Sequence, residues 1–171
     1  MEFSKPDTIA AERGRYHLYI SHACPYSARA VLARCVKQLT DVVSMSSLDP
    51  VRGPDGWVFA DGEYADPLNG FRALREAYEA TDASYEGRVS VPVLWDRKTR
   101  RIVSSESGDI MRMFGSAWDT VGGAANVTLY PERLRAEIQR LKSERTDTRR
   151  KVDALLRDFE SLELHVEGAE Q

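Results

Sequence analysis

The spacing of hydrophobic residues predicts that the chain opens with a strand followed by a helix. Residues 16–20, Tyr-His-Leu-Tyr-Ile, are largely aromatic and aliphatic and predict a buried strand. A helix is expected to begin at Pro25, because proline is favoured at the first helical position, where its missing amide hydrogen leaves nothing unpaired. Apolar residues then recur at helical spacing and form the predicted inward face: Ala28, Val31, Leu32, Cys35, Val36 and Leu39. In this interpretation Cys35 is a buried packing residue.

The next segment predicts a second strand, a long connection and a second helix. Residues 42–45, Val-Val-Ser-Met, form the short strand, and a connection rich in Gly, Pro and Asp follows over residues 47–63. A connection of this length is unusual in a compact domain and suggests function. Asp66-Pro67 has the form of a helix cap with proline just inside the helix. Three apolar residues continue as its inward face: Phe71, Leu74 and Tyr78.

A hairpin and a third helix complete the pattern. Residues 89–95 predict a strand interrupted by Pro92, residues 101–103 predict its partner after a turn, and a helix runs from about residue 106 to 114. The element order is strand, helix, strand, helix, hairpin, helix. Such an order predicts an α/β protein with a mixed sheet and helices on both faces, which is the thioredoxin-like fold.

The composition changes after residue 118 and predicts a separate helical extension. We expect an N-terminal arm at 1–14, the thioredoxin-like domain at 15–118, a linker at 119–130 and a charged helical tail at 131–171. Nine tail positions alternate spacings of four and three, the a/d pattern of a coiled coil: Leu134, Ile138, Leu141, Arg145, Thr148, Val152, Leu155, Phe159 and Leu162. Two interpretations fit this pattern. Either a helical hairpin broken near residues 143–148 packs on its own domain, or one long helix pairs between chains.

Charge and cysteine content narrow the class of protein. The net charge of −3 offers no basic excess for nucleic acid or an anionic membrane surface. No apolar run approaches the roughly 20 residues of a membrane span, and the first residues lack the apolar core of a secretory signal. Two cysteines are too few for a disulfide scaffold. We therefore expect a soluble, cytoplasmic protein that binds neither nucleic acid nor membrane.

Cys24 is the candidate nucleophile. At the start of a helix, unpaired backbone amides and the positive end of the helix dipole stabilise a thiolate. Ser27 stands where a dithiol enzyme keeps its second cysteine, so an external thiol would have to resolve any mixed disulfide. This pattern predicts monothiol chemistry, although a helix-start cysteine with no chemical role fits it too.

Two further segments predict a binding site for a thiol peptide. If the Val91-Pro92 peptide bond is cis, the backbone before it turns outward and can pair with an extended ligand. The polar triplet Ser105-Glu106-Ser107 at a helix start offers hydroxyl, carboxylate and backbone amide groups that can hold the amine and carboxylate of a γ-glutamyl group. Each segment also has an ordinary structural explanation, an edge-strand proline in one case and a helix cap in the other. No metal is expected at this site.

These motifs, together with the sequence segments between them, resemble those of a known protein family. The matching runs are residues 15–21, Cys24-Pro25, residues 56–59, 66–70 and 89–96, and Glu106-Ser107. They resemble the glutathionyl-hydroquinone reductases, the Xi-class branch of the glutathione transferases, from about residue 15 to 141. The resemblance implies that Cys24 attacks the thioether sulfur of a glutathionyl-hydroquinone. Hydroquinone and a cysteine–glutathione disulfide result, and a second glutathione regenerates the thiolate.

The resemblance also implies a role for each site residue. Trp57 lies over the active site, Val91 pairs its backbone with the cysteinyl part of glutathione, and Glu106 and Ser107 bind the γ-glutamyl end. Tyr26 and Pro92 complete the predicted site for glutathione or a related low-molecular-weight thiol.

The sequence also departs from the family. Tyr26 and Ser27 replace the usual tryptophan and alanine. The family continues after Leu-Tyr-Pro, here residues 129–131, into a helical domain that supplies tyrosines to the quinone pocket, whereas residues 131–171 contain no tyrosine.

Two functions therefore compete. The first is a thiol-dependent oxidoreductase or transferase that acts on glutathione, with quinone conjugates as substrates. The second is a catalytically degenerate thioredoxin-fold module that forms a homodimer or docks on a helical partner protein through its C-terminal helix.

Overall fold

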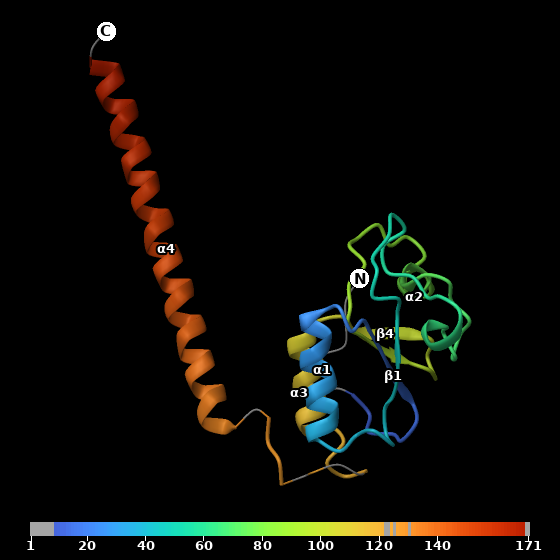
Figure 1. Cartoon of the computed structure of the whole chain (residues 1–171). Helices are drawn as coiled ribbons and strands as arrows, with labels where there is room; N and C mark the ends of the chain where they lie inside the picture. The colour runs from blue at the N-terminus through green and yellow to red at the C-terminus, as the bar shows by residue number, and fades with distance from the viewer. Residues whose placement is uncertain (1–8, 122–123, 125, 130, 170–171) are drawn as a thin grey trace. The chain divides into compact units, whose positions relative to one another are not determined.

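The structure is a computed structural model in which the chain divides into two compact units, Met1–Leu129 and Tyr130–Gln171. It describes residues 9–121, 124, 126–129 and 131–169, with the side chains of the last helix as far as Arg157 (Figure 1). Most of the predicted N-terminal arm and the side chains of Phe159 and Leu162 lie outside the described residues.

The described elements follow the predicted order. They are β1 (Tyr16–Ile20), α1 (Pro25–Val36), β2 (Ser44–Ser47), the 3-10 turn η2 (Gly62–Tyr64), α2 (Leu74–Thr81), β3 (Val93–Asp96), β4 (Arg101–Ser104), α3 (Ser107–Ser116) and α4 (Glu132–Ala169). The strand order in the sheet is β2-β1-β3-β4. β1 runs parallel to β2 and antiparallel to β3, and β4 pairs antiparallel with β3. This arrangement confirms the predicted thioredoxin-like fold.

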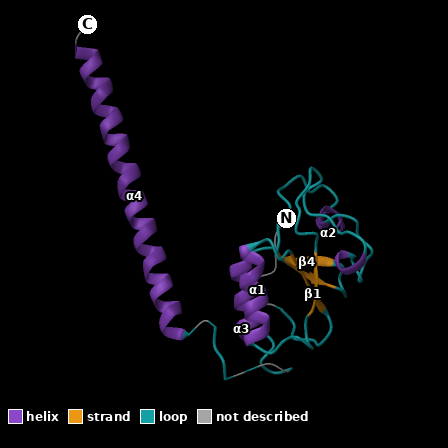
Figure 2. Ribbon diagram, viewed as in Figure 1, coloured by secondary structure: helices purple, strands orange, loops and turns teal. Residues whose placement is uncertain are grey.

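Helices cover both faces of the sheet, with α1 and α3 on one face and α2 on the other (Figure 2). Successive side chains of a strand point to opposite faces. Accordingly, Leu18 of β1 packs in one cluster with Ala30 of α1 and Ile110 of α3, whereas Tyr19 packs with Leu74 of α2. The central strand β1 is therefore buried on both sides.

Three element boundaries differ from the prediction. The strand predicted at 89–95 begins only at Val93, directly after Pro92, which has no amide hydrogen to donate to the sheet. The strand predicted at 42–45 begins two residues later, because the amides of Val42 and Val43 both donate to the Leu39 carbonyl and close a turn. The second helix does not begin at Asp66. Its carboxylate instead accepts bonds from the amides of Leu68, Asn69 and Phe71 and holds a loop.

α2 begins at Leu74. The Glu76 carboxylate accepts bonds of 2.8 and 2.9 Å from the amides of Arg72 and Ala73, and so satisfies donors that precede the helix. Leu74 and Tyr78 are buried, as the predicted inward face requires, whereas Phe71 lies in the loop.

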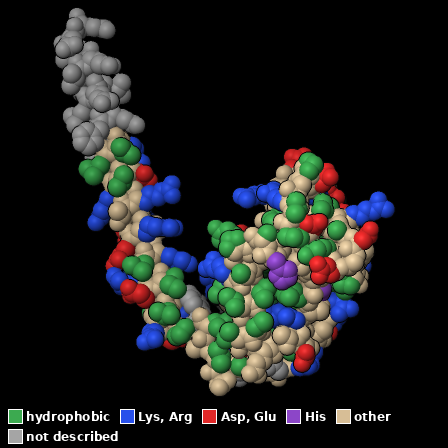
Figure 3. Space-filling model, in the orientation of Figure 1, with side chains coloured by type: hydrophobic (Ala, Val, Ile, Leu, Met, Phe, Trp, Pro, Cys, Tyr) green, Lys and Arg blue, Asp and Glu red, His purple; other side chains and the backbone are tan. Residues whose placement is uncertain are grey.

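The predicted inward face of α1 is only partly correct: Leu39, just beyond the helix, is fully buried and Val31 packs against the core, but the other four predicted residues are exposed. The buried residues of this helix are Ser27, Ala30, Ala33 and Arg34. Leu32 and Val36 are 63% and 49% exposed, and Cys35 is also exposed, so it is not a core residue. Small side chains form most of the buried face where α1 meets the sheet and α3, whereas Ala28, Leu32, Cys35 and Val36 face solvent. Hydrophobic side chains gather over this part of the unit in Figure 3.

The described part of residues 119–130 is fastened to the end of α1 by Lys37, the residue that follows this helix. The Lys37 side chain is fully buried, and its Nζ donates to the Asp119 carboxylate at 2.7 Å. It also donates to the backbone carbonyls of Ala124 and Val127 at 2.8 and 2.7 Å. An ammonium group has three N–H donors, so this buried charge is fully hydrogen-bonded.

The second unit contains one continuous helix, α4. The break that a helical hairpin needs near residues 143–148 does not occur, so the hairpin interpretation is wrong. Pairing of the single helix between chains stays a prediction. Four of the predicted a/d residues are about half exposed: Leu134, Leu141, Val152 and Leu155. Among the described residues, no helix combines the length and the apolar composition required to cross a bilayer.

β1 contains a buried histidine whose neutral form is hydrogen-bonded. His17 Nδ1 lies 2.7 Å from Ser44 Oγ, and His17 Nε2 lies 2.8 Å from Ser46 Oγ. Burial disfavours the charged ring and lowers the pKa of His17 to about 4. An unfolded histidine titrates near pH 6.5, so the unfolded chain binds the extra proton between the two values.

We predict that acid destabilises the fold through His17. As the pH falls from about 6.5 to about 4, the unfolding free energy should fall by up to about 3 kcal/mol from this residue. Urea unfolding of the wild type and of His17→Gln at several pH values measures the difference, which isolates histidine from the carboxylates. Parallel pH profiles for the two proteins would contradict the prediction.

Candidate functional site

Cys24 occupies the N-cap position of α1. Its backbone is extended, Pro25 follows in the first helical turn, and the Cys24 carbonyl accepts the Ala28 amide at 3.2 Å. The Cys24 amide donates to the Ser21 carbonyl at 3.0 Å and closes the turn that leaves β1. The thiol is half-buried. The predicted helix start is therefore correct, and the sulfur sits at the mouth of the helix.

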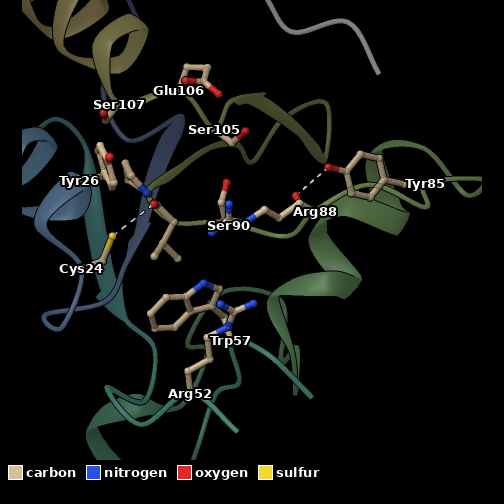
Figure 4. A pocket seen from close by; sticks show the side chains of 12 residues that line it. Cys24, Tyr26, Arg52, Trp57, Tyr85, Arg88, Ser90, Ser105, Glu106 and Ser107 are labelled. Atoms are coloured by element: carbon tan, nitrogen blue, oxygen red, sulfur yellow. Dashed lines mark hydrogen bonds between the residues drawn. The ribbon is translucent and has the colours of Figure 1, made fainter. Parts of the chain in front are cut away.

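The thiol faces the segment that precedes β3. Cys24 Sγ donates a long hydrogen bond of 3.6 Å to the Val91 carbonyl (Figure 4). The Val91-Pro92 peptide bond is cis, and both residues are buried. The predicted nucleophile and the predicted backbone-pairing residue thus lie in contact, although they are 67 positions apart.

Glu106 and Ser107 lie at the start of α3, beside the same segment. Glu106 is the N-cap residue, but its side chain makes no capping bond and is exposed. The turn is held instead by the Glu106 amide, which donates to Ser104 Oγ at 3.1 Å. Arg29 Nη1 of α1 lies 3.5 Å from Ser107 Oγ. Glu106 therefore occupies the N-cap position, but its carboxylate does not act as the cap.

Trp57 is held over this region by backbone bonds between the long connection and the start of α2. The Leu74 amide donates to the Trp57 carbonyl at 2.9 Å, and the Phe59 amide donates to the Arg72 carbonyl at 2.9 Å. The loop after Phe59 is fixed in turn by Asp66, which accepts the Tyr19 hydroxyl at 3.0 Å. The connection is therefore an ordered wall of the site.

One cavity of about 540 Å³ brings the predicted site residues together. All seven line it: Cys24, Tyr26, Trp57, Val91, Pro92, Glu106 and Ser107. They come from the start of α1, the long connection, the segment before β3 and the start of α3. The cavity therefore joins four segments that are distant in sequence.

Ser105, the first residue of the predicted polar triplet, also lines the cavity. The sequence reasoning missed four further lining residues: Arg52, Tyr85, Arg88 and Ser90. Arg88 directly precedes the segment predicted as a strand at 89–95, and Arg52 lies in the connection that carries Trp57. Their positions next to recognised motifs were the available signal. Isolated arginines in polar loops resemble ordinary solvated charges, which is why the pattern did not single them out.

Ser27 has a structural role. It is buried, and its Oγ accepts the Ser21 amide at 3.2 Å. Cys35 lies near the other end of α1, about 16 Å along the helix from Cys24, beyond the roughly 7 Å that a disulfide can bridge. Cys24 therefore has no internal disulfide partner. Among the residues that the structure describes, no group of His, Cys, Asp and Glu side chains could hold a metal ion.

The unit formed by residues 1–129 has a thioredoxin-like fold, with a cysteine at the start of its first helix and a cis-proline segment opposite that cysteine. This combination is typical of thiol-binding domains. Residues 23–117 match the family described as glutathione S-transferase, N-terminal domain. This match covers more than half of the chain, so the chain belongs to that family.

Curated relatives and solved structures agree with this assignment. The chain is 40% identical to glutathionyl-hydroquinone reductase PcpF of Sphingobium chlorophenolicum over 77% of this chain and 42% of PcpF. It is 42% identical to glutathionyl-hydroquinone reductase YqjG of Escherichia coli K12 over 81% of this chain and 43% of YqjG. The chain thus spans about two-fifths of the length of these relatives.

The structural match covers the same part of the chain. The glutathione-bound structure of Escherichia coli YqjG superposes with a TM-score of 0.72, covering 78% of this chain and 44% of that one at 42% identity. Glutathione transferase Xi 1 of Trametes versicolor gives a TM-score of 0.73 at 40% identity, over 81% of this chain and 50% of that one. The predicted resemblance to the Xi class is confirmed.

Proposed function

We propose that the protein is a thiol-dependent oxidoreductase or transferase in which Cys24 forms a mixed disulfide with glutathione or a similar low-molecular-weight thiol. One observation supports this proposal above the others. The predicted nucleophile Cys24 and all six residues predicted for thiol binding line one cavity. A relative of known structure, Escherichia coli YqjG, was solved with glutathione bound.

The γ-glutamyl and cysteinyl units of such a thiol each have complementary groups in the cavity. The exposed Glu106 carboxylate pairs with the ligand amine, and Ser107 with the amides at the start of α3 receives the ligand carboxylate. The backbone of Val91 pairs with the cysteinyl unit, which brings the ligand sulfur toward Cys24. Trp57 and Tyr26 flank the sulfur as apolar walls.

The reaction inherited from the family is reductive removal of glutathione from a quinone conjugate. The Cys24 thiolate attacks the thioether sulfur of a glutathionyl-hydroquinone, so that a sulfur–sulfur bond forms and the carbon–sulfur bond breaks. The ring carbon keeps the electron pair and takes a proton, which gives hydroquinone. A second glutathione then attacks the mixed disulfide, releasing oxidised glutathione and the Cys24 thiolate.

A second candidate function is supported by α4. Four apolar side chains of its a/d stripe are about half exposed: Leu134, Leu141, Val152 and Leu155. A long helix gains most of its stability by burying such a stripe. We propose that this stripe pairs two copies of the chain into a homodimer or docks on a helical partner protein. A degenerate module of this kind would use the thioredoxin-like unit without its chemistry.

The remaining proposals concern boundaries and location. We take residues 15–118 as the thiol-binding domain, 119–130 as the linker and 131–171 as the helical tail. The reducing cytoplasm suits a chain whose function needs a free thiol. Nucleic acid and membrane are not proposed as partners, because the net charge of −3 favours neither.

We predict that Cys24 reacts with both oxidised glutathione and a glutathionyl-hydroquinone, and intact mass spectrometry tests this. The wild type should gain one glutathione from either reagent and release hydroquinone from the second. Cys24→Ser should release none, because the attacking sulfur is missing.

The matched control is Cys35→Ser. Cys35 is exposed and can exchange slowly with a disulfide, but it lies outside the cavity and should not cleave a thioether. Hydroquinone release that persists in Cys24→Ser would refute the proposed chemistry. No release from the wild type, with oxidised glutathione still adding to Cys24, would restrict the protein to disulfide exchange.

Replacing Glu106 by Gln should weaken glutathione binding at least about tenfold, because a charge-assisted hydrogen bond contributes about 1.5–3 kcal/mol. Calorimetric titration and thermal melting measure the two effects separately. Asp109→Asn is the control, since it removes a carboxylate from the same helical turn but does not line the cavity. A lower melting temperature with unchanged affinity would assign Glu106 a purely structural role.

Leu155→Lys should convert a dimer into a monomer, because it places a charge within the apolar part of the a/d stripe. Analytical ultracentrifugation of the full chain measures the change. Ala154→Lys adds the same charge one position away from the stripe and should leave the dimer intact. A wild type that sediments as a monomer at tens of micromolar would rule out pairing between copies.

A further inference from the structure

A second cavity of about 610 Å³ adjoins the Cys24 cavity and is bordered by three arginines, Arg52, Arg75 and Arg88. Arg52 and Arg88 line both cavities, whereas Arg75 lines the second alone. In Figure 4, Arg52 lies beside Trp57 on the side of the Cys24 cavity away from Glu106 and Ser107, and Arg88 lies next to Ser90. The two arginines therefore mark the passage from one cavity to the next.

The three arginines come from three segments, and each segment is fastened in place. Arg75 belongs to the first turn of α2. The backbone around Arg88 is held by the Tyr85 hydroxyl, which donates to the Arg88 carbonyl at 2.9 Å, and by the Tyr78 hydroxyl, which donates to the Ser90 carbonyl at 3.0 Å.

Arg52 lies with its guanidinium carbon 5.7 Å from the centre of the Trp57 ring, a cation–π distance. Its placement therefore depends on the same tryptophan that lines the thiol cavity.

The charge of this cavity is unbalanced. None of the three guanidinium groups forms a salt bridge with any residue that the structure describes. One carboxylate, that of Asp55, also borders the cavity. Three positive groups against one negative group leave an excess that favours an anionic ligand, and guanidinium is suited to bidentate binding of carboxylate.

The proposed thiol site determines which part of a ligand reaches this cavity. With the γ-glutamyl amine at Glu106 and the sulfur near Cys24, the C-terminal end of the peptide points toward Arg52 and Arg88. A peptide that ends in glycine, such as glutathione, would end beside these two arginines. A longer or more acidic C-terminal residue continues into the second cavity and meets Arg75.

We propose that the second cavity is a subsite for an additional carboxylate, so that the protein prefers γ-glutamyl-cysteinyl peptides with an acidic residue after cysteine. Arg75 is the specificity-determining residue of this subsite, and Arg52 and Arg88 are shared with the thiol site. The inference rests on the proposed function, because it uses the ligand orientation that Glu106 and Cys24 define.

The test is calorimetric titration with two S-methylated peptides, γ-Glu-Cys-Gly and γ-Glu-Cys-Glu. S-methylation prevents disulfide chemistry, so only binding is measured. The wild type should bind the Glu-terminated peptide about fivefold more tightly, which is the upper range for one exposed ion pair. Added salt should shrink this advantage, because exposed charges are screened.

Arg75→Ala should abolish the preference and leave the affinity for the Gly-terminated peptide unchanged. Arg133→Ala, which removes one positive charge from α4, should keep the preference. Equal affinities for the two peptides in the wild type would overturn the subsite while leaving the proposed function intact. An equal loss of both in Arg75→Ala would also overturn it, since the residue would then act on the whole site. Binding of the Gly-terminated peptide alone would overturn only the subsite, whereas failure of both peptides to bind would overturn the proposed function and the subsite together.

Discussion

The burial of β1 on both faces is the constraint on which the rest of the structure depends. A strand in this position must satisfy every polar group it carries, because an unpaired buried donor or acceptor costs about 1–3 kcal/mol. His17 meets two serine hydroxyls of β2, and Tyr19 donates to Asp66. The bonds of His17 therefore fix the edge strand β2, and the bond of Tyr19 fixes the loop before α2.

The same strand sets the geometry of the site. β3 runs antiparallel to β1, so the segment before β3 lies beside the end of β1, where Tyr19 is paired with Val93. β4 runs antiparallel to β3, and Ser104 at its end is paired with Leu94 near the start of β3. The end of β1, the start of β3 and the end of β4 therefore lie at the same end of the sheet. Cys24, Val91 and Glu106 follow or precede these strand ends, so the sheet topology brings them together although they are far apart in sequence.

The sequence predicted this convergence well because its signals are local and strong. Proline after Cys24 marks a helix start, and proline inside an apolar run marks an unusual strand entry. Glu106 stood out for a similar reason, since a polar triplet separates β4 from the apolar spacing of α3. Each of the three motifs, containing Cys24, Pro92 and Glu106, could be recognised by itself. The predicted fold class then brought the three motifs to the same end of the sheet.

The errors share a different origin. The inward face of α1 depends on how closely the helix approaches the sheet, and small residues such as Ala30 and Ala33 allow contact that a hydrophobicity pattern assigns to Leu32 and Val36. Asp66 was mistaken for a helix cap because the same carboxylate chemistry also closes a loop. Arg52 and Arg88 are recognisable as site residues only because the fold places them beside Trp57 and the cavity. The spacing of residues along the sequence does not reveal this proximity.

The single sulfur at the head of α1 has a consequence for redox equilibrium. With Ser27 hydrogen-bonded into the turn and Cys35 out of reach, the proposed oxidation of Cys24 by glutathione would stop at one mixed disulfide. Exchange of one protein thiol with oxidised glutathione consumes one disulfide and releases one thiol, so the oxidised fraction follows the ratio of the two forms of glutathione. A dithiol site releases two thiols and depends on the square of the thiol concentration. A site built like this one therefore responds to the oxidation state of the thiol pool and is indifferent to its size.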